Sequence, residues 1–336
     1  MTPRGRTGLA LGGATLALFA LALIALGAGR YPISLTELAH VLWARVSGGT
    51  GAATADAIVW QLRLPRAGVA MLVGAALAAA GTAYQHLFRN PLVAPDTLGV
   101  SSGAALGAVL GIVAGASFVA VQAAALVGGL GAVGIVMLIA ARLEAHDPLV
   151  TLILTGIVVA SLLGAAIALV KYLADPYNQL PAITFWLMGS LASASVADIT
   201  SLLPAVALAL VVLFALAWRV NLLALPEDEA RALGVNTRRL RGVVIAAATL
   251  ATAASVAVSG VIGWVGLVVP HMARRVVGPE FSRLLPAAAL FGAAFMLVID
   301  TISRSVAPVE IPPGILTAVI GTPVFIALLA RAQRIF

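Results

Sequence analysis

The 336-residue sequence contains no cysteine, and both charged and aromatic residues are scarce in it. Without cysteine the chain has no disulfide bond, no thiol nucleophile and no cysteine-ligated metal. Only 10% of the residues are charged and 6% are aromatic, whereas 62% are hydrophobic, which is far from the balance of a soluble domain. The sequence therefore predicts an integral membrane protein.

The sequence has no nucleotide-binding loop, and its one match to a catalytic pattern lies in the wrong structural context. No segment fits G-x-x-x-x-G-K-[ST], the loop that cradles the phosphates of ATP, so we expect the chain to hydrolyse no ATP by itself. Gly99 to Gly103 fits the G-x-S-x-G pattern of serine hydrolases, but Ser101 opens an apolar helix instead of the required strand-to-helix turn. We expect no catalytic residue, no cofactor and no metal site in this chain.

Apolar segments separated by charges, prolines and glycines make up most of the sequence. We predict about ten transmembrane helices, near residues 9–29, 67–88, 98–114, 118–141, 149–171, 199–218, 242–261, 264–277, 284–304 and 313–330. The first segment is long enough to span a bilayer, so we interpret it as a helix and not as a cleaved signal peptide. The chain contains 33 glycines, small residues that let membrane helices approach closely. The prediction is one all-α transmembrane domain over residues 1–336.

Two uncharged stretches are too long for a single helix. Gly115-Ala116-Ser117 is the expected turn in the first, and Gly260 with Gly263 is expected to break the second into a full helix and a shorter one. Short or broken helices often line transport pathways.

The basic residues predict how the chain is oriented. With the N-terminus in the cytoplasm, 14 of the 20 Lys and Arg residues lie inside and six lie outside. The six are Arg30, Arg45, Arg63, Arg66, Lys171 and Arg304. The chain has a formal net charge of +7 at pH 7, and its Lys and Arg residues are spread between apolar segments. We therefore attribute this charge to membrane orientation and not to nucleic-acid binding. Both termini should be cytoplasmic, with the long loops 30–62 outside and 219–241 inside.

Three separated blocks carry a family resemblance. They are GTAYQHLFRNPLVAPDTLGVSSG from Gly81, GVIGWVGLVVPHMAR from Gly260 and EIPPGILTAVIGTPVF from Glu310. With these blocks the chain resembles, from Arg63 through Phe325, the permeases of type II ABC importers, which take up vitamin B12, haem and ferric siderophores.

The resemblance implies a multi-pass subunit of the bacterial inner membrane that forms a homodimer. Two separate subunits would bind ATP and Mg on the cytoplasmic side, and a periplasmic substrate-binding protein would dock outside. The resemblance also implies that helices two to five and seven to ten are inverted repeats, which agrees with the predicted orientation.

The inner loop 219–241 is expected to hold a short helix. Pro226, three acidic residues and Gly234 give it a start and an end. The resemblance implies that this is the coupling helix that contacts the ATPase, with Leu225, Ala230, Leu233 and Gly234 at the contact. The alternative is an amphipathic helix lying on the lipid headgroups.

Two further sets of residues take roles from the resemblance. Asn90, Leu92, Leu149 and Val150 correspond to the cytoplasmic gate of the pathway, although simple packing at helix ends is an alternative. Arg63, Arg66 and Arg304 correspond to arginines that receive the binding protein. The alternative is that Arg63 and Arg66 anchor a helix at the headgroups while Arg304 neutralises Asp300.

The sequence thus predicts the permease of an ATP-driven importer for a large iron chelate such as haem or a ferric siderophore. A cobalamin importer is the close alternative. A proton- or sodium-coupled carrier is less favoured, because Asp300 is the only carboxylate in the predicted spans and lies near a helix end.

Overall fold

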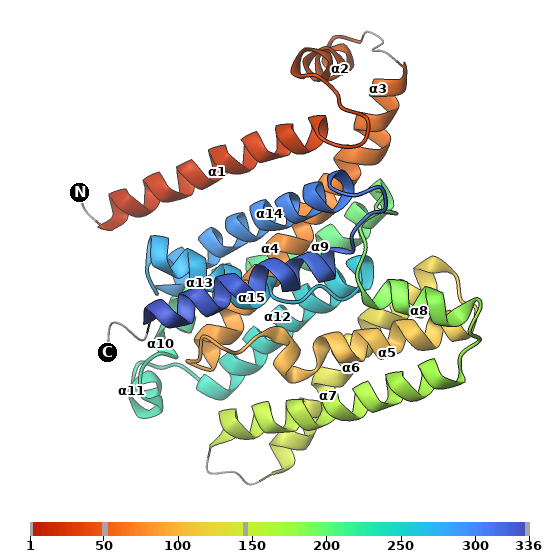
Figure 1. Cartoon of the computed structure of the whole chain (residues 1–336). Helices are drawn as coiled ribbons and strands as arrows, with labels where there is room; N and C mark the ends of the chain where they lie inside the picture. The colour runs from red at the N-terminus through yellow and green to blue at the C-terminus, as the bar shows by residue number, and fades with distance from the viewer. Residues whose placement is uncertain (1–2, 49–52, 144–146, 333–336) are drawn as a thin grey trace.

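The computed structural model describes residues 3–48, 53–143 and 147–332, and every regular element in these ranges is helical (Figure 1). The ten expected helices are present as α1 (Pro3–Gly27), α4 (Leu64–Leu87), α5 (Val100–Val113), α6 (Phe118–Arg142), α7 (Pro148–Leu173), α9 (Val196–Ala215), α12 (Thr237–Ser259), α13 (Val265–Val277), α14 (Phe281–Ser305) and α15 (Pro313–Ala332). Between them lie α2 (Leu35–Ser47), α3 (Ala53–Ala57), η1 (Ile58–Arg63), η2 (Pro95–Leu98), α8 (Gln179–Leu187), α10 (Ala217–Leu222) and α11 (Glu227–Ala232).

Length and composition mark most of these helices as membrane spans. Among the described residues, seven helices are long and apolar enough to cross a bilayer: α1, the continuous helix through α4, α6, α7, α9, α12 and α14. The other three expected helices, α5, α13 and α15, are shorter or less apolar. The predicted all-α membrane fold is confirmed.

Helix α4 occupies the centre of the bundle. It is apolar nearly all round and packs against α9, α12, α13 and α14, as expected for a helix surrounded by others. Glycines permit the closest crossings, because a Cβ on Gly81 would lie 1.8 Å from the Gly266 carbonyl oxygen and one on Gly74 would lie 2.1 Å from that of Gly292. The predicted close packing through small residues is present here.

The second predicted span begins earlier than the sequence indicated. Instead of starting near residue 67, the helix runs without a break over Thr54–Leu87, 34 residues or about 51 Å, well beyond the roughly 30 Å of a hydrocarbon core. The π-helical turn of η1 directly precedes Pro65, whose missing N–H would otherwise favour a helix start. The outer region 30–62, expected as a loop, therefore contains α2, α3 and η1.

The two predicted breaks are confirmed. α5 and α6 are separated by a turn in which Gly115 has φ +67°, and α12 and α13 are separated by residues 260–264. Gly260 has φ +69°, and a Cβ there would lie 2.4 Å from the Trp186 carbonyl oxygen. Glycine is thus required at this break both by conformation and by the close approach of the last turn of α8.

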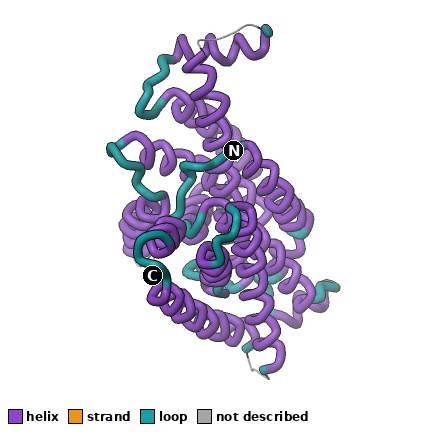
Figure 2. Tube along the Cα trace, turned by 90° about the vertical axis from the view of Figure 1, so that its right-hand side faces the viewer, coloured by secondary structure: helices purple, strands orange, loops and turns teal. Residues whose placement is uncertain are grey.

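The two long connections lie at opposite ends of the bundle. In Figure 1, α2 and α3 stand at one end and α11 at the other. Figure 2 shows the α2–α3 region projecting from the bundle at the top of the view. α4 begins at the α2–α3 end, whereas α12 begins beside α11, so the two central helices run in opposite directions. This is the arrangement expected for two inverted repeats that begin with these helices.

Candidate functional site

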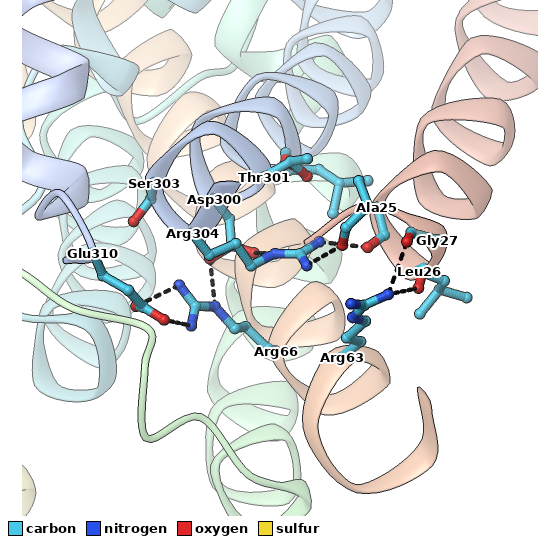
Figure 3. Close-up of polar contacts among 12 residues, drawn as sticks. Ala25, Leu26, Gly27, Arg63, Arg66, Asp300, Thr301, Ser303, Arg304 and Glu310 are labelled. Atoms are coloured by element: carbon cyan, nitrogen blue, oxygen red, sulfur yellow. Dashed lines mark hydrogen bonds and ion pairs between the residues drawn. The ribbon is translucent and has the colours of Figure 1, made fainter. Parts of the chain in front are cut away.

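Three arginines meet at the α2–α3 end of the bundle, where α1, α4, α14 and the segment before α15 come together. Figure 3 shows the guanidinium groups of Arg63, Arg66 and Arg304 among carboxylates and backbone carbonyls. All three side chains are buried, at 7 to 8% exposure, and Asp300 is 1% exposed. The sequence-predicted docking arginines are therefore brought together in one cluster.

Arg66 forms the ionic centre of this cluster. Its Nε donates to Asp300 Oδ1 at 2.7 Å, and its two terminal nitrogens donate to Glu310 Oε1 and Oε2 at 2.9 and 3.0 Å. A bidentate pair of this kind fixes orientation as well as charge. Through Asp300 and Glu310, Arg66 connects α4 to α14 and to the segment leading into α15. The pairing of Glu310 with Arg66 could not be predicted from the sequence, because the nearest charged residue to Glu310 along the chain is Arg304.

The other two arginines hold the end of α1. Arg63 donates to the carbonyl oxygens of Leu26 and Gly27 at 2.6 and 2.9 Å and to that of Tyr31 at 2.5 Å. Arg304 donates to the carbonyls of Ala25 and Ala28 and, at 3.3 Å, to Asp300 Oδ2. The carbonyls at a helix C-terminus lack partners within the helix, so these guanidiniums cap α1.

Arginines that receive a binding protein would be expected to be exposed, but these three are buried. The predicted Asp300–Arg304 contact is present, but all three guanidiniums are engaged within the chain because buried charges require partners. The role of these arginines in docking stays a prediction. An outer cavity of about 320 Å³ is lined by these three arginines and by Arg30. Arg30 is exposed, and its side chain has no hydrogen bond or ion pair with any described residue.

The predicted gate residues occupy the opposite end. Asn90 forms a turn after α4, in which its side-chain oxygen accepts from the Leu92 amide at 2.9 Å, and the Leu92 side chain is exposed. Val150 is also exposed, while Leu149 is partly buried in the first turn of α7, which Asp147 caps. No hydrogen bond joins the two pairs in the described part of the chain. Their gating role stays a prediction.

The residue before Asn90 makes a link that the sequence did not indicate. Arg89 has φ +50°, an uncommon conformation for a residue with a side chain. Its Nε and a terminal nitrogen donate to the Leu223 carbonyl at 2.9 and 2.6 Å, and the same nitrogen donates to the Leu225 carbonyl. The turn that carries Asn90 and Leu92 is thus attached to the segment just before α11.

The short helix expected in the inner loop is α11. Pro226 precedes it, three acidic residues form its first turn, and Gly234 follows it with φ +79°. Leu233 is 61% exposed and Gly234 is exposed, whereas Leu225 is partly buried. Ala230, expected at the ATPase contact, is only 1% exposed because it packs inside the loop. Leu233 and Gly234 are therefore the members of this set that a partner can reach.

Glu227 fixes the position of α11 against α12. Its carboxylate accepts from Thr237 Oγ1 at 3.0 Å and pairs with Arg231 and Arg241 at 2.5 and 3.4 Å. Partial burial alone would raise the pKa of Glu227, but the Thr237 hydrogen bond and the charges of Arg241 and Arg231 lower it below its ordinary value. The carboxylate is ionised at neutral pH.

The long apolar helices define a multi-pass membrane protein, and its broken helix pair is of the kind that often lines a transport pathway. The model of the FecCD transport family matches residues 16–331. The chain belongs to this family, and it is a permease subunit of an ABC importer.

Individual relatives agree with this assignment. The molybdate import system permease protein MolB of Haemophilus influenzae is 40% identical over 96% of this chain and 95% of its own length. The hemin transport system permease protein HmuU of Yersinia pestis is 41% identical over 82% of this chain and 84% of its own. A solved metal-chelate type ABC transporter in an inward-facing conformation has a TM-score of 0.87 and 39% identity, covering 96% of this chain and 98% of that one.

Proposed function

We propose that this chain imports a metal chelate across the bacterial inner membrane, with a ferric siderophore or haem as the first candidate and cobalamin as the close alternative. The observation that carries the proposal is the likeness, over nearly the whole chain, to a solved metal-chelate transporter. The likeness to a permease named for hemin supports an iron-containing cargo.

Molybdate is a second candidate substrate. It is favoured by one specific observation, the 40% identity to a molybdate permease over 96% of this chain. The test is ATP-dependent uptake by the assembled importer, with a ferric siderophore, haem, cobalamin and molybdate compared under the same conditions. Uptake of a chelate but not of molybdate supports the first candidate, and the reverse result replaces it by the second.

The proposed assembly contains two copies of the chain, two ATP-binding subunits beneath α11 and a periplasmic binding protein above the arginine cluster. ATP and Mg would be bound by the ATP-binding subunits. The exposed apolar side chain of Leu233 supports a partner contact at α11, because an exposed Leu beside three acidic residues is poorly placed against anionic headgroups. The hydrogen bonds from Arg89 then give a physical route from this contact to the turn at Asn90 and Leu92.

Binding-protein docking is proposed at the outer cavity beside the arginine cluster. The cluster contains three guanidiniums and two carboxylates, so it carries an excess positive charge, and exposed Arg30 adds another at the rim. An acidic partner would be steered to such a surface, with an effect that fades as salt is added. Changing Arg30 to Glu should slow association most at low salt, whereas an unchanged rate would remove Arg30 from the docking surface.

The proposed orientation places both termini and α11 in the cytoplasm. Because the native sequence has no cysteine, a single cysteine can be introduced without removing any other. Cysteine in place of exposed Gly234 should react with a membrane-impermeant maleimide only in inside-out vesicles, and cysteine in place of exposed Val309 only in right-side-out vesicles. The opposite pattern would reverse the topology.

A further inference from the structure

A second cavity, separate from the outer one, lies at the α11 end of the molecule. It has a volume of about 360 Å³ and lies between the end of α9, α10 and the first turns of α12. Its lining includes Arg219, Asn236, Arg239, Leu216, Leu240 and Val243, and also Gly234 at the end of the α11 loop, one of the residues that a partner can reach. The cavity is thus lined by both arginines and aliphatic side chains.

The two arginines of this cavity are not neutralised by the chain. Arg219 and Arg239 are exposed, and neither guanidinium group has a hydrogen bond or ion pair with any described residue. The carboxylate of Glu227, on the neighbouring α11, is already occupied by Arg231 and Arg241. The lining residues include no acid. Two fixed positive charges therefore face one space, which favours an anion there.

An exposed apolar strip lies along the second half of α9, the helix whose C-terminal end borders the cavity. Leu208, Val211 and Phe214 are exposed at spacings of three residues, which places them on one side of the helix. Trp218, 71% exposed, stands at the end of this strip and directly beside Arg219. Tryptophan is the side chain typical of the boundary between hydrocarbon and headgroups. The order toward this end of the molecule is therefore exposed apolar residues, a tryptophan and then the arginines of the cavity.

We propose that this cavity binds the phosphate headgroup of an anionic phospholipid of the cytoplasmic leaflet, with the acyl chains along the exposed strip of α9. A headgroup phosphate suits a cavity lined by two guanidiniums, and the exposed apolar strip on the adjoining helix favours a lipid over a free anion. The assignment to the cytoplasmic leaflet rests on the proposed orientation. The binding itself rests on the cavity and its charges.

The test compares lipid retention by the full-length chain and two double variants, using native mass spectrometry with phosphatidylglycerol and phosphatidylcholine as probes. Arg219→Gln/Arg239→Gln removes the two cavity charges. Arg238→Gln/Arg142→Gln removes two exposed charges at the same end of the molecule but outside the cavity, so its change in net charge is identical. Melting temperature in lipid-free neutral detergent verifies that each variant is folded.

The native chain and the control variant should retain phosphatidylglycerol at least about tenfold more tightly than phosphatidylcholine, and the cavity variant should lose most of this preference. Inorganic phosphate should not displace the lipid. Equal losses in both variants, or no loss in the cavity variant, would overturn the proposal. Displacement by inorganic phosphate would make the cavity a free-anion site and would also overturn it.

Two further outcomes are separable. If the cavity variant is poorly folded, the single substitutions Arg219→Gln and Arg239→Gln are measured instead, and each should weaken phosphatidylglycerol binding several-fold. If the cavity variant fails to copurify with the ATP-binding subunit while its lipid retention is unchanged, the cavity is a protein contact and the lipid assignment is wrong. Lipid retention is measured without transport and without reference to membrane orientation. The result therefore holds even if the proposed import activity or the proposed orientation is wrong.

Discussion

The guanidinium group of Arg89 is hydrogen-bonded to the carbonyl oxygen of Leu223, at 2.9 Å from Nε and 2.6 Å from a terminal nitrogen. These two residues join the turn after the central helix to the segment before α11. If movement at α11 reaches the pathway through these hydrogen bonds, removing them should lower transport while ATP hydrolysis continues.

We therefore expect Arg89→Gln, in the assembled importer, to lower substrate uptake about tenfold while ATP hydrolysis stays within about twofold of the native rate. The measurement is the ratio of uptake to hydrolysis in proteoliposomes. Arg142→Gln, an exposed arginine at the same end with no recorded partner among the described residues, is the matched control. A parallel fall in both rates would show that Arg89 acts only in folding or assembly.

The outer cluster should be a major source of stability. Arg66→Met leaves Asp300, which is 1% exposed, with Arg304 alone at 3.3 Å, and breaking a buried pair costs about 3–5 kcal/mol. The melting temperature in detergent should fall clearly. Arg30→Met, which removes an exposed cation at the same end, should leave it nearly unchanged. Similar melting temperatures for the two variants would contradict a stabilising role for this cluster.

The helix crossings should tolerate no side chain larger than hydrogen. A Cβ at Gly81 would lie 1.8 Å from the Gly266 carbonyl oxygen, so Gly81→Ala must push α4 and α13 apart, at a cost of about 1–3 kcal/mol or more. Gly131→Ala in α6 meets nothing within 4 Å and should be neutral or slightly stabilising. Yield and monodispersity on size exclusion are the measurement. Normal behaviour of Gly81→Ala would show that this crossing is not tightly packed.

The proposed ATPase contact can be tested at Leu233, which is exposed at the end of α11. Leu233→Asp would place a charge in the contact and should reduce copurification of the ATP-binding subunit by at least about tenfold. Val306→Asp, an equally exposed position at the other end of the bundle, should have no effect. Copurification at the native yield would remove Leu233 from the interface.

Hydropathy was sufficient to locate the ten bundle helices, and glycine positions were sufficient to locate the breaks at Gly115 and Gly260. Both are local properties, set by side-chain transfer to lipid and by backbone conformation. The extension of the second helix was not visible, because Pro65 favours a helix start and only the preceding π turn accommodates it. The helix α2 was missed because its residues lie in a polar stretch between two spans.

The candidate site was predictable as a set of positions but not as a set of contacts. The resemblance brought Arg63, Arg66 and Arg304 together, whereas their burial depends on carbonyls of α1 and on Glu310, which are distant along the chain. The contacts of Arg89 with Leu223 and Leu225 join residues more than 130 positions apart and have no local signal. Ala230 was expected at a surface, but one turn of helix against its own loop buries it.

We propose that this chain is the transmembrane part of an ATP-driven importer of metal chelates. The most direct test of this proposal is uptake of a radiolabelled ferric siderophore or haem into proteoliposomes that contain the chain, its ATP-binding subunit and its binding protein. We expect uptake that requires ATP and all three components, persists when the proton gradient is collapsed, and is absent when the chain is reconstituted alone. Uptake by the chain alone, driven by a proton or sodium gradient and indifferent to ATP, would contradict it.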